Sequence, residues 1–143
     1  MDSIIQQFFG EEGISPGYFL LGGFILMIWV VGNWKLYAKC DQPGIAAIIP
    51  IYNAVIAMRI VGRPDSHVFY FLIPIYGQTY FPIKLAIELV QSFGKYHFLD
   101  YIIAVVFNVF YVLNLGLAYN EEYYGTVYGQ SVSELKQRKP QLA

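Results

Sequence analysis

The stretch GYFLLGGFILMIWVVGNW occupies residues 17–34 and contains no charged side chain. A helix needs about 20 apolar residues to cross the hydrocarbon core of a bilayer. The stretch reaches that length if the side chains of Lys35 and Tyr37 extend to the headgroup region. Its end carries Trp29 and Trp34, and tryptophan is enriched at membrane–water interfaces. Residues 17–34 therefore predict a transmembrane helix.

The composition of the whole chain agrees with a membrane protein. The 143 residues are 57% hydrophobic and only 13% charged, whereas a soluble domain carries about 25% charged residues. A chain this short has a high surface-to-volume ratio and has no large water-soluble core in which to bury so many apolar side chains. The net charge of −1 provides no basic surface for nucleic acid. The expected environment is the lipid bilayer.

Three further apolar segments follow the first one. They cover residues 44–61, 67–92 and 98–118, and prolines interrupt the first two of them. Proline removes a helix hydrogen bond, so a buried partner must satisfy the freed carbonyl group. The predicted fold class is an all-α integral membrane protein, a bundle of about four Pro-kinked transmembrane helices. Three helices plus a re-entrant segment at 44–61 is the alternative.

Three regions are expected along the chain. Residues 1–16 form a short interfacial N-terminal segment, with a frayed terminus as the alternative. Residues 17–118 form the transmembrane helical bundle. Residues 119–143 form a polar C-terminal tail.

The distribution of basic residues predicts an orientation. Lys35 and Lys39 follow the first span and no Lys or Arg precedes it, so the positive-inside rule places the N-terminus outside the cytoplasm. Four spans would return the C-terminus to the same side. Arg59 and Arg63 then lie on the side that the rule disfavours.

A short motif occurs twice in the chain. Ile49-Pro50-Ile51-Tyr52 is repeated as Ile73-Pro74-Ile75-Tyr76, and each copy is followed by a basic residue and then by glycine plus a base. Two broken helices in corresponding positions are typical of transporter binding sites. Structural packing of two bent helices is the other interpretation. We expect the two motifs to be bends in membrane helices that pack close to each other.

Polar residues inside the apolar segments are candidates for structural or partner contacts. Lys84 and Glu88 have the i, i+4 spacing of a helix ion pair, and asparagines in a span can hydrogen-bond to neighbouring helices. The complete candidate set is Pro50, Tyr52, Asn53, Pro74, Tyr76, Lys84, Glu88, Asn108 and Asn114.

The sequence does not indicate an enzyme. Two Ser-x-x-Lys matches occur, at Ser92–Lys95 and Ser133–Lys136. Neither has a recognisable oxyanion hole or a surrounding catalytic fold, so no catalytic residues are predicted. The single cysteine, Cys40, excludes an internal disulfide. Because His67 and His97 lack further ligands at metal-binding spacing, no metal and no cofactor are expected.

Several motifs together carry a resemblance to a known family. The segments are Lys39–Gly44, Ile48–Asn53, the second Ile-Pro motif and Phe93-Gly94-Lys95. They resemble a family of small uncharacterised bacterial polytopic membrane proteins often labelled signal peptidase I-like. This chain departs from the family pattern at Cys40-Asp41, Ile45 and Gly77. The resemblance implies a multi-pass protein of the bacterial inner membrane and no known reaction.

These observations lead to two functional hypotheses. The first is a non-catalytic accessory or scaffold subunit of a larger bacterial inner-membrane complex, linked to protein export. The alternative is a small oligomeric transporter or channel with a site at the two Pro-broken helices. The expected partners are the lipid bilayer and a larger integral membrane protein or complex, and a homo-oligomer is the partner in the alternative.

Overall fold

The computed structural model describes residues 3, 5 and 15–138, so most of the predicted N-terminal segment 1–16 lies outside the described residues. Within residues 15–138 the regular secondary structure is entirely helical, which confirms the predicted all-α class. The elements are α2 (Pro16–Lys39), η1 (Gly44–Ala47), α3 (Pro50–Val61), η2 (Asp65–Leu72), η3 (Tyr76–Tyr80), α4 (Phe81–Ser92), α5 (Phe98–Val106), α6 (Asn108–Leu117) and α7 (Val132–Leu135).

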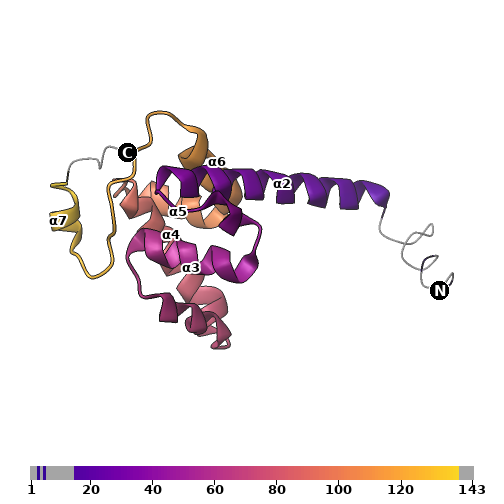
Figure 1. Cartoon of the computed structure of the whole chain (residues 1–143), viewed down its shortest axis with the longest axis horizontal. Coiled ribbons are helices and arrows are strands. Elements are labelled where there is room, and N and C mark those ends of the chain that lie inside the picture. Colours follow the sequence, from indigo (N-terminus) through magenta and orange to yellow (C-terminus); the bar gives the residue numbers. More distant parts are fainter. Residues whose placement is uncertain (1–2, 4, 6–14, 139–143) are drawn as a thin grey trace.

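Helix α2 confirms the predicted apolar helix. It begins after Ser15, whose hydroxyl accepts a hydrogen bond from the backbone N–H of Gly17, and it continues for 24 residues. Its N-terminal half projects beyond the other labelled helices (Figure 1), and the side chain of Leu20 is 76% exposed there. Its C-terminal half enters the core, where Leu36 and Tyr37 are each 1% exposed. The C-terminal half of α2 is therefore packed in the core, whereas apolar side chains such as Leu20 and Leu26 in its N-terminal half are exposed.

The packed half of α2 lies directly against α6, because two glycines let the backbones approach. A Cβ atom added at Gly32 would lie 3.0 Å from the Cα atom of Leu113. One added at Gly116 would lie 2.7 Å from the carbonyl oxygen of Gly32. Small residues at a helix interface allow this type of close packing in membrane proteins.

Segment 44–61 differs from the predicted span. It forms a short 3₁₀ turn, η1, followed by the 12-residue helix α3. At 1.5 Å per residue α3 is only about 18 Å long, well short of the bilayer core. Pro50 stands at the first turn of α3, where its missing N–H has no helical partner to lose. The proline therefore starts a helix, and the prediction that it kinks one is wrong.

The long predicted segment 67–92 is also broken. The 3₁₀ helix η2 ends at Leu72, a turn containing Pro74 follows, and the π-helix η3 leads directly into α4. Ile75 in this turn has φ 68°, a conformation that is unusual for a β-branched residue. The second proline thus lies in a turn between helices rather than at a bend within one.

The predicted span 98–118 consists of two helices, α5 and α6, that meet at Phe107 with a bend of 113°. The side-chain amide of Asn108 donates to the carbonyl of Ala104 at 3.2 Å. The backbone N–H of Asn108 would bond that carbonyl in a continuous helix, so the side chain competes with the helix here. Within residues 15–138, one helix is long and apolar enough to cross a membrane, or two if the bent pair counts as one span. The predicted four spans are not confirmed.

The core lies between the packed half of α2, α3 and α6. Its buried side chains include Leu36 and Tyr37 from α2, Ile56 and Ile60 from α3, and Leu115 from α6. A second small cluster joins α3 to the C-terminal tail through Val61, Val127 and Leu135. The described part of the tail therefore packs on the helices.

Candidate functional site

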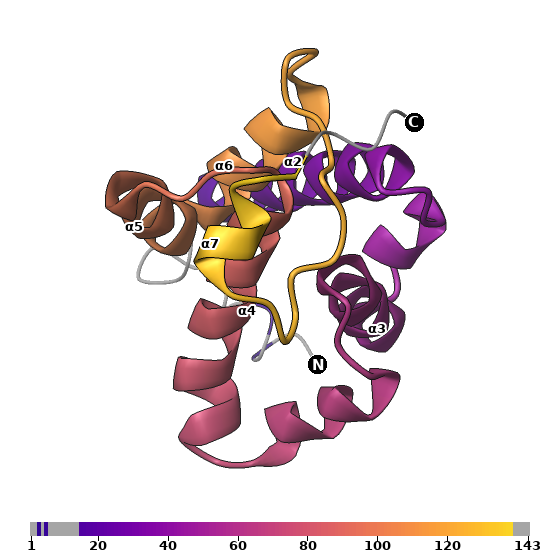
Figure 2. The ribbon, with the colours of Figure 1, turned by 90° about the vertical axis from the view of Figure 1, so that its left-hand side faces the viewer.

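The C-terminal ends of four helices lie together, and the tail after α6 crosses all of them. We call this region the polar end; it comprises Lys39, residues 60–63, residues 92–95 and residues 118–128. Figure 2 views it directly and shows the tail running between α3 and α4 before it forms α7. The last carbonyl groups of a helix lack helical partners and need other donors. The tail and one lysine supply these donors.

Lys39, the last residue of α2, caps helix α6. Its Nζ atom donates to the carbonyl oxygens of Leu115 at 2.7 Å, Ala118 at 2.5 Å and Glu121 at 3.0 Å. A cation at a helix C-terminus is also attracted by the negative end of the helix dipole. This one side chain therefore fixes the end of α2, the end of α6 and the start of the tail.

Backbone and tyrosine donors of the tail bind the ends of α3 and α4. The hydroxyl of Tyr123 donates to the carbonyl of Ile60 at 2.5 Å. The N–H groups of Val127 and Tyr128 donate to the carbonyl of Val61 at 3.0 and 2.9 Å. The N–H of Tyr124 donates to the carbonyl of Ser92 at 2.7 Å.

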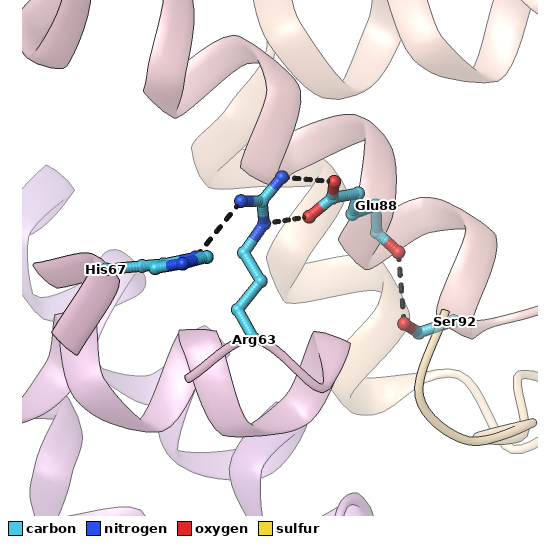
Figure 3. Close-up of polar contacts among 4 residues, drawn as sticks. All are labelled: Arg63, His67, Glu88 and Ser92. Atoms are coloured by element: carbon cyan, nitrogen blue, oxygen red, sulfur yellow. Dashed lines mark hydrogen bonds and ion pairs between the residues drawn. The ribbon is translucent and has the colours of Figure 1, made fainter. Parts of the chain in front are cut away.

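A buried ion pair lies beside these contacts (Figure 3). The Nε atom of Arg63 lies 2.5 Å from Oε2 of Glu88, and its Nη2 atom lies 2.5 Å from Oε1. Arg63 is 6% exposed and Glu88 is 9% exposed. Arg63 directly follows the C-cap of α3 and Glu88 lies in α4, so the pair joins these two helices. The geometry is the two-pronged contact between guanidinium and carboxylate, which is the strongest form of this interaction.

Aromatic and imidazole groups enclose the guanidinium. Its carbon atom lies 4.6 Å from the ring centroid of Tyr128 and 5.4 Å from that of Phe81. Nη1 of Arg63 lies 3.3 Å from Nδ1 of His67. All three guanidinium nitrogens and both carboxylate oxygens thus have partners within the protein. The cluster can neutralise charge and hold α3, α4 and the tail together.

Two further ion pairs lie outside this cluster. Arg59 and Asp65 pair across the end of α3, with side chains 46% and 49% exposed. The hydrogen bonds from Arg59 lower the pKa of the Asp65 carboxyl. Lys95 lies 2.6 Å from Glu121 and links the end of α4 to the tail.

The sequence pairing of Lys84 with Glu88 differs from the structure. The carboxylate of Glu88 binds Arg63, while the side chain of Lys84 is exposed on α4. Arg63 is 25 residues away from Glu88 in the sequence. Helical periodicity cannot indicate a partner at that separation, so the sequence does not predict the pairing of Arg63 with Glu88. The sequence does indicate that a helix ends at Gly62-Arg63.

The two Ile-Pro-Ile-Tyr motifs have different surroundings. Tyr52 packs against the core, and Asn53 accepts a hydrogen bond from the hydroxyl of Tyr37 at 2.7 Å. Tyr76 contacts the rings of Tyr70, Tyr80 and Phe81. The first motif lies at the start of a helix, and Pro74 of the second is exposed in a turn. Tyr52 therefore contacts the hydrophobic core, whereas Tyr76 contacts a separate group of aromatic rings.

The asparagines of α6 also differ. The side chain of Asn108 bonds the carbonyl of Ala104 and lines a cavity, whereas Asn114 is exposed. Asn33 of α2 is buried and lines the same cavity. Asn33 is not among the sequence-based candidates, although its amide is the only one in the uncharged stretch 17–34.

The Ser-x-x-Lys matches do not bring serine and lysine together. The hydroxyl of Ser92 donates to the carbonyl of Glu88 at 3.0 Å, and Lys95 pairs with Glu121. Ser133 contacts the hydroxyl of Ser131. Among residues 3, 5 and 15–138, no three metal-binding side chains gather into a site.

The arrangement defines a class of protein: a small helical fold with one projecting apolar helix and a closed polar end. The chain belongs to DUF5684, a family of unknown function, whose pattern matches residues 45–126, more than half of the chain. No curated protein and no solved structure matches the chain. The matched range includes both Ile-Pro motifs and most of the polar end, and it ends inside the tail.

Proposed function

We propose that this chain is an integral protein of the bacterial inner membrane that serves as a non-catalytic accessory subunit of a larger complex. The observation that carries the proposal is the projecting half of α2. Its side chains Leu20, Leu21 and Leu26 are exposed in the described fold, and only lipid or another apolar helix suits such apolar side chains.

The dimensions of α2 support membrane insertion. Its 24 residues extend for about 36 Å at 1.5 Å per residue, enough to cross a core of about 30 Å. Only 17% of the most apolar 18-residue stretch of α2 is buried within the protein. The C-terminal half supplies core residues such as Leu36 and Tyr37, which is not expected of a signal sequence that is removed.

The polar end supports an orientation. Lys39, Arg63 and Lys95 come from three different helix ends, and all three lie at the polar end. Arg138 joins them by donating to the carbonyl of Thr126 at 2.6 Å. In the four-span scheme Arg63 lies on the side of the membrane that the positive-inside rule disfavours. This conflict is absent when all these basic residues lie on one side of the membrane. The positive-inside rule then places the polar end in the cytoplasm and the N-terminus outside.

Reporter fusions test this orientation. A reporter at the N-terminus should be active only outside the cytoplasm, and one after the tail should be active only inside. Both reporters on the same side would contradict a single crossing by α2 and would favour an even number of spans.

Protein export is the process that we propose for the complex. Its support is the similarity of the Ile-Pro-Ile-Tyr-Asn and Phe-Gly-Lys motifs to proteins labelled signal peptidase I-like. The exposed face of α2 also offers a contact surface for a partner helix, because Gly22 and Gly23 have no neighbouring atoms within 4 Å of an added Cβ. Such small residues allow close approach of a second helix.

Purification in mild detergent tests the subunit role. We expect a larger membrane protein to co-elute in stoichiometric amount and to survive gel filtration. The double variant Gly22→Leu/Gly23→Leu should lose it, because bulky side chains separate the helices, whereas Tyr18→Leu should retain it as a matched control. Elution of the chain alone, as a monomer or homo-oligomer, would contradict the proposal.

The transporter alternative has weaker support. A pocket of about 420 Å³ lies at the first proline motif, next to η2. Its lining residues are Pro50, Ile51, Ala54, Val68, Phe69, Phe71 and Leu72. None of these side chains offers a polar group, so the pocket suits an apolar segment or a lipid chain better than a polar solute.

A further inference from the structure

A separate cavity of about 280 Å³ lies between α2, α3, α4 and α6. Asn33 and Tyr37 reach it from α2, Asn53 from α3 and Asn108 from α6. The rest of the lining is apolar, with Trp29, Leu85 and Val112 among its side chains. Three carboxamides from three helices therefore converge on one otherwise apolar space.

Part of the hydrogen-bonding capacity of these groups is already used. The amide nitrogen of Asn33 donates to the carbonyl of Trp29 at 2.8 Å, and that of Asn108 donates to Ala104 at 3.2 Å. The hydroxyl of Tyr37 donates to Oδ1 of Asn53 at 2.7 Å. These bonds hold the amides in place.

The remaining capacity faces open space. An asparagine side chain has two N–H donors and one oxygen acceptor. Among the described residues, no hydrogen bond reaches the Oδ1 atom of Asn33 or of Asn108. Neither oxygen is fully buried. Asn33 itself is 7% exposed. Because Asn33 lines the cavity, its oxygen and second N–H are available to a molecule that enters there.

The described residues that line the cavity are all uncharged. A charged ligand would lose its hydration without gaining a counter-charge, which is strongly unfavourable in an apolar site. An entirely apolar ligand would leave the amide groups unpaired, which is also unfavourable. The lining thus selects a neutral molecule that has both an apolar body and a polar group able to donate and accept.

We propose that the cavity is a binding site for a small neutral molecule with an apolar body and one amide or hydroxyl group. Asn33 and Asn108 bind the polar group, and the side chains of Trp29, Leu85 and Val112 contact the apolar body. The volume lies just below the usual range for drug-sized ligands of about 300–1,000 Å³, so the ligand is smaller than these. The site is independent of the proposed subunit role, because its lining residues come from packed elements and not from the projecting half of α2.

Benzamide is a suitable probe, and Trp29 reports its binding. The chain has two tryptophans, and Trp34 lies outside this cavity. In the Trp34→Phe protein, fluorescence excited selectively at tryptophan therefore arises at the cavity wall. We expect a saturable change on titration with benzamide in mild detergent. Toluene, which has the ring without the amide, should bind at least tenfold more weakly.

Substitutions of the asparagines test whether benzamide binding depends on hydrogen bonds to their amide groups or only on apolar contacts. Asn33→Leu and Asn108→Leu should each weaken benzamide binding at least tenfold, while Asn114→Leu, an exposed asparagine on the same helix as Asn108, should leave it unchanged. If Asn33→Leu fails to fold, as judged by its thermal midpoint, the exposed Asn108 still provides the test.

Three results would overturn the proposal. The first is the absence of saturable binding up to the solubility of benzamide, which is expected if the cavity holds only water. The second is equal binding of toluene and benzamide. The third is an equal loss of benzamide binding in Asn108→Leu and Asn114→Leu.

Discussion

Replacement of Glu88 by leucine should strongly destabilise the fold, because it leaves a buried guanidinium without its carboxylate. The change removes two hydrogen bonds of 2.5 Å to Arg63. A hydrogen bond to a charged group contributes about 1.5–3 kcal/mol, and breaking one side of a buried pair costs about 3–5 kcal/mol. For a chain of this size such a loss corresponds to a fall of about 10 °C or more in the thermal midpoint.

The measurement is thermal unfolding in mild detergent, and the chain supplies its own control. Asp65→Leu removes the carboxylate of an equally direct but exposed pair with Arg59, so its thermal midpoint should stay close to that of the wild type. The double variant Arg63→Met/Glu88→Leu should recover most of the loss, because it removes the unpaired charge. The reasoning is refuted if Glu88→Leu melts no lower than Asp65→Leu, or if the double variant is less stable than Glu88→Leu alone.

Three further predictions concern α2 and its packing partner. Lys39→Met should lower the thermal midpoint by several degrees, since it removes the donor that caps three carbonyl groups. The control Lys35→Met, at an exposed position of the same helix, should leave the midpoint unchanged. Equal midpoints for the two variants would contradict the capping role. Gly116→Ala should destabilise the helix pair, because its Cβ would lie 2.7 Å from a backbone oxygen, and Gly22→Ala, which meets no atom within 4 Å, should be tolerated in the same melting experiment. Burial raises the pKa of the Cys40 thiol to about 12, so the thiol stays protonated at pH 8. Iodoacetamide should therefore react with it slowly until the protein is denatured or the pH approaches that value. Rapid labelling of the folded protein at pH 8, measured by mass spectrometry, would contradict this, because it requires an accessible and ionised thiol.

Local features of the sequence were sufficient for the helical class and for α2. A long run of uncharged apolar residues indicates a helix that can cross a membrane, whatever the helix packs against. The reason is that this capacity depends on the length of the run and on the free energy of transferring its side chains into lipid. Helix ends were also readable locally: Gly62 and Gly94 adopt positive φ, as glycine does at helix C-termini. The repeated proline motif marked two real interruptions of the chain at Pro50 and Pro74, although it did not show that these are a helix start and a turn.

Tertiary structure decided where the polar groups find partners. Glu88 had a local candidate in Lys84 at the correct helical spacing, but the folded chain brings Arg63 to it from another element. Lys39 is 76 residues or more from the carbonyl groups that it caps. The break at Phe107 has neither proline nor glycine, and the side chain of Asn108 bonds a backbone carbonyl of the preceding helix there. Sequence periodicity describes neighbours within about one helical turn, whereas these contacts, like the amide-lined cavity, exist only once α2, α3, α4 and α6 have packed together.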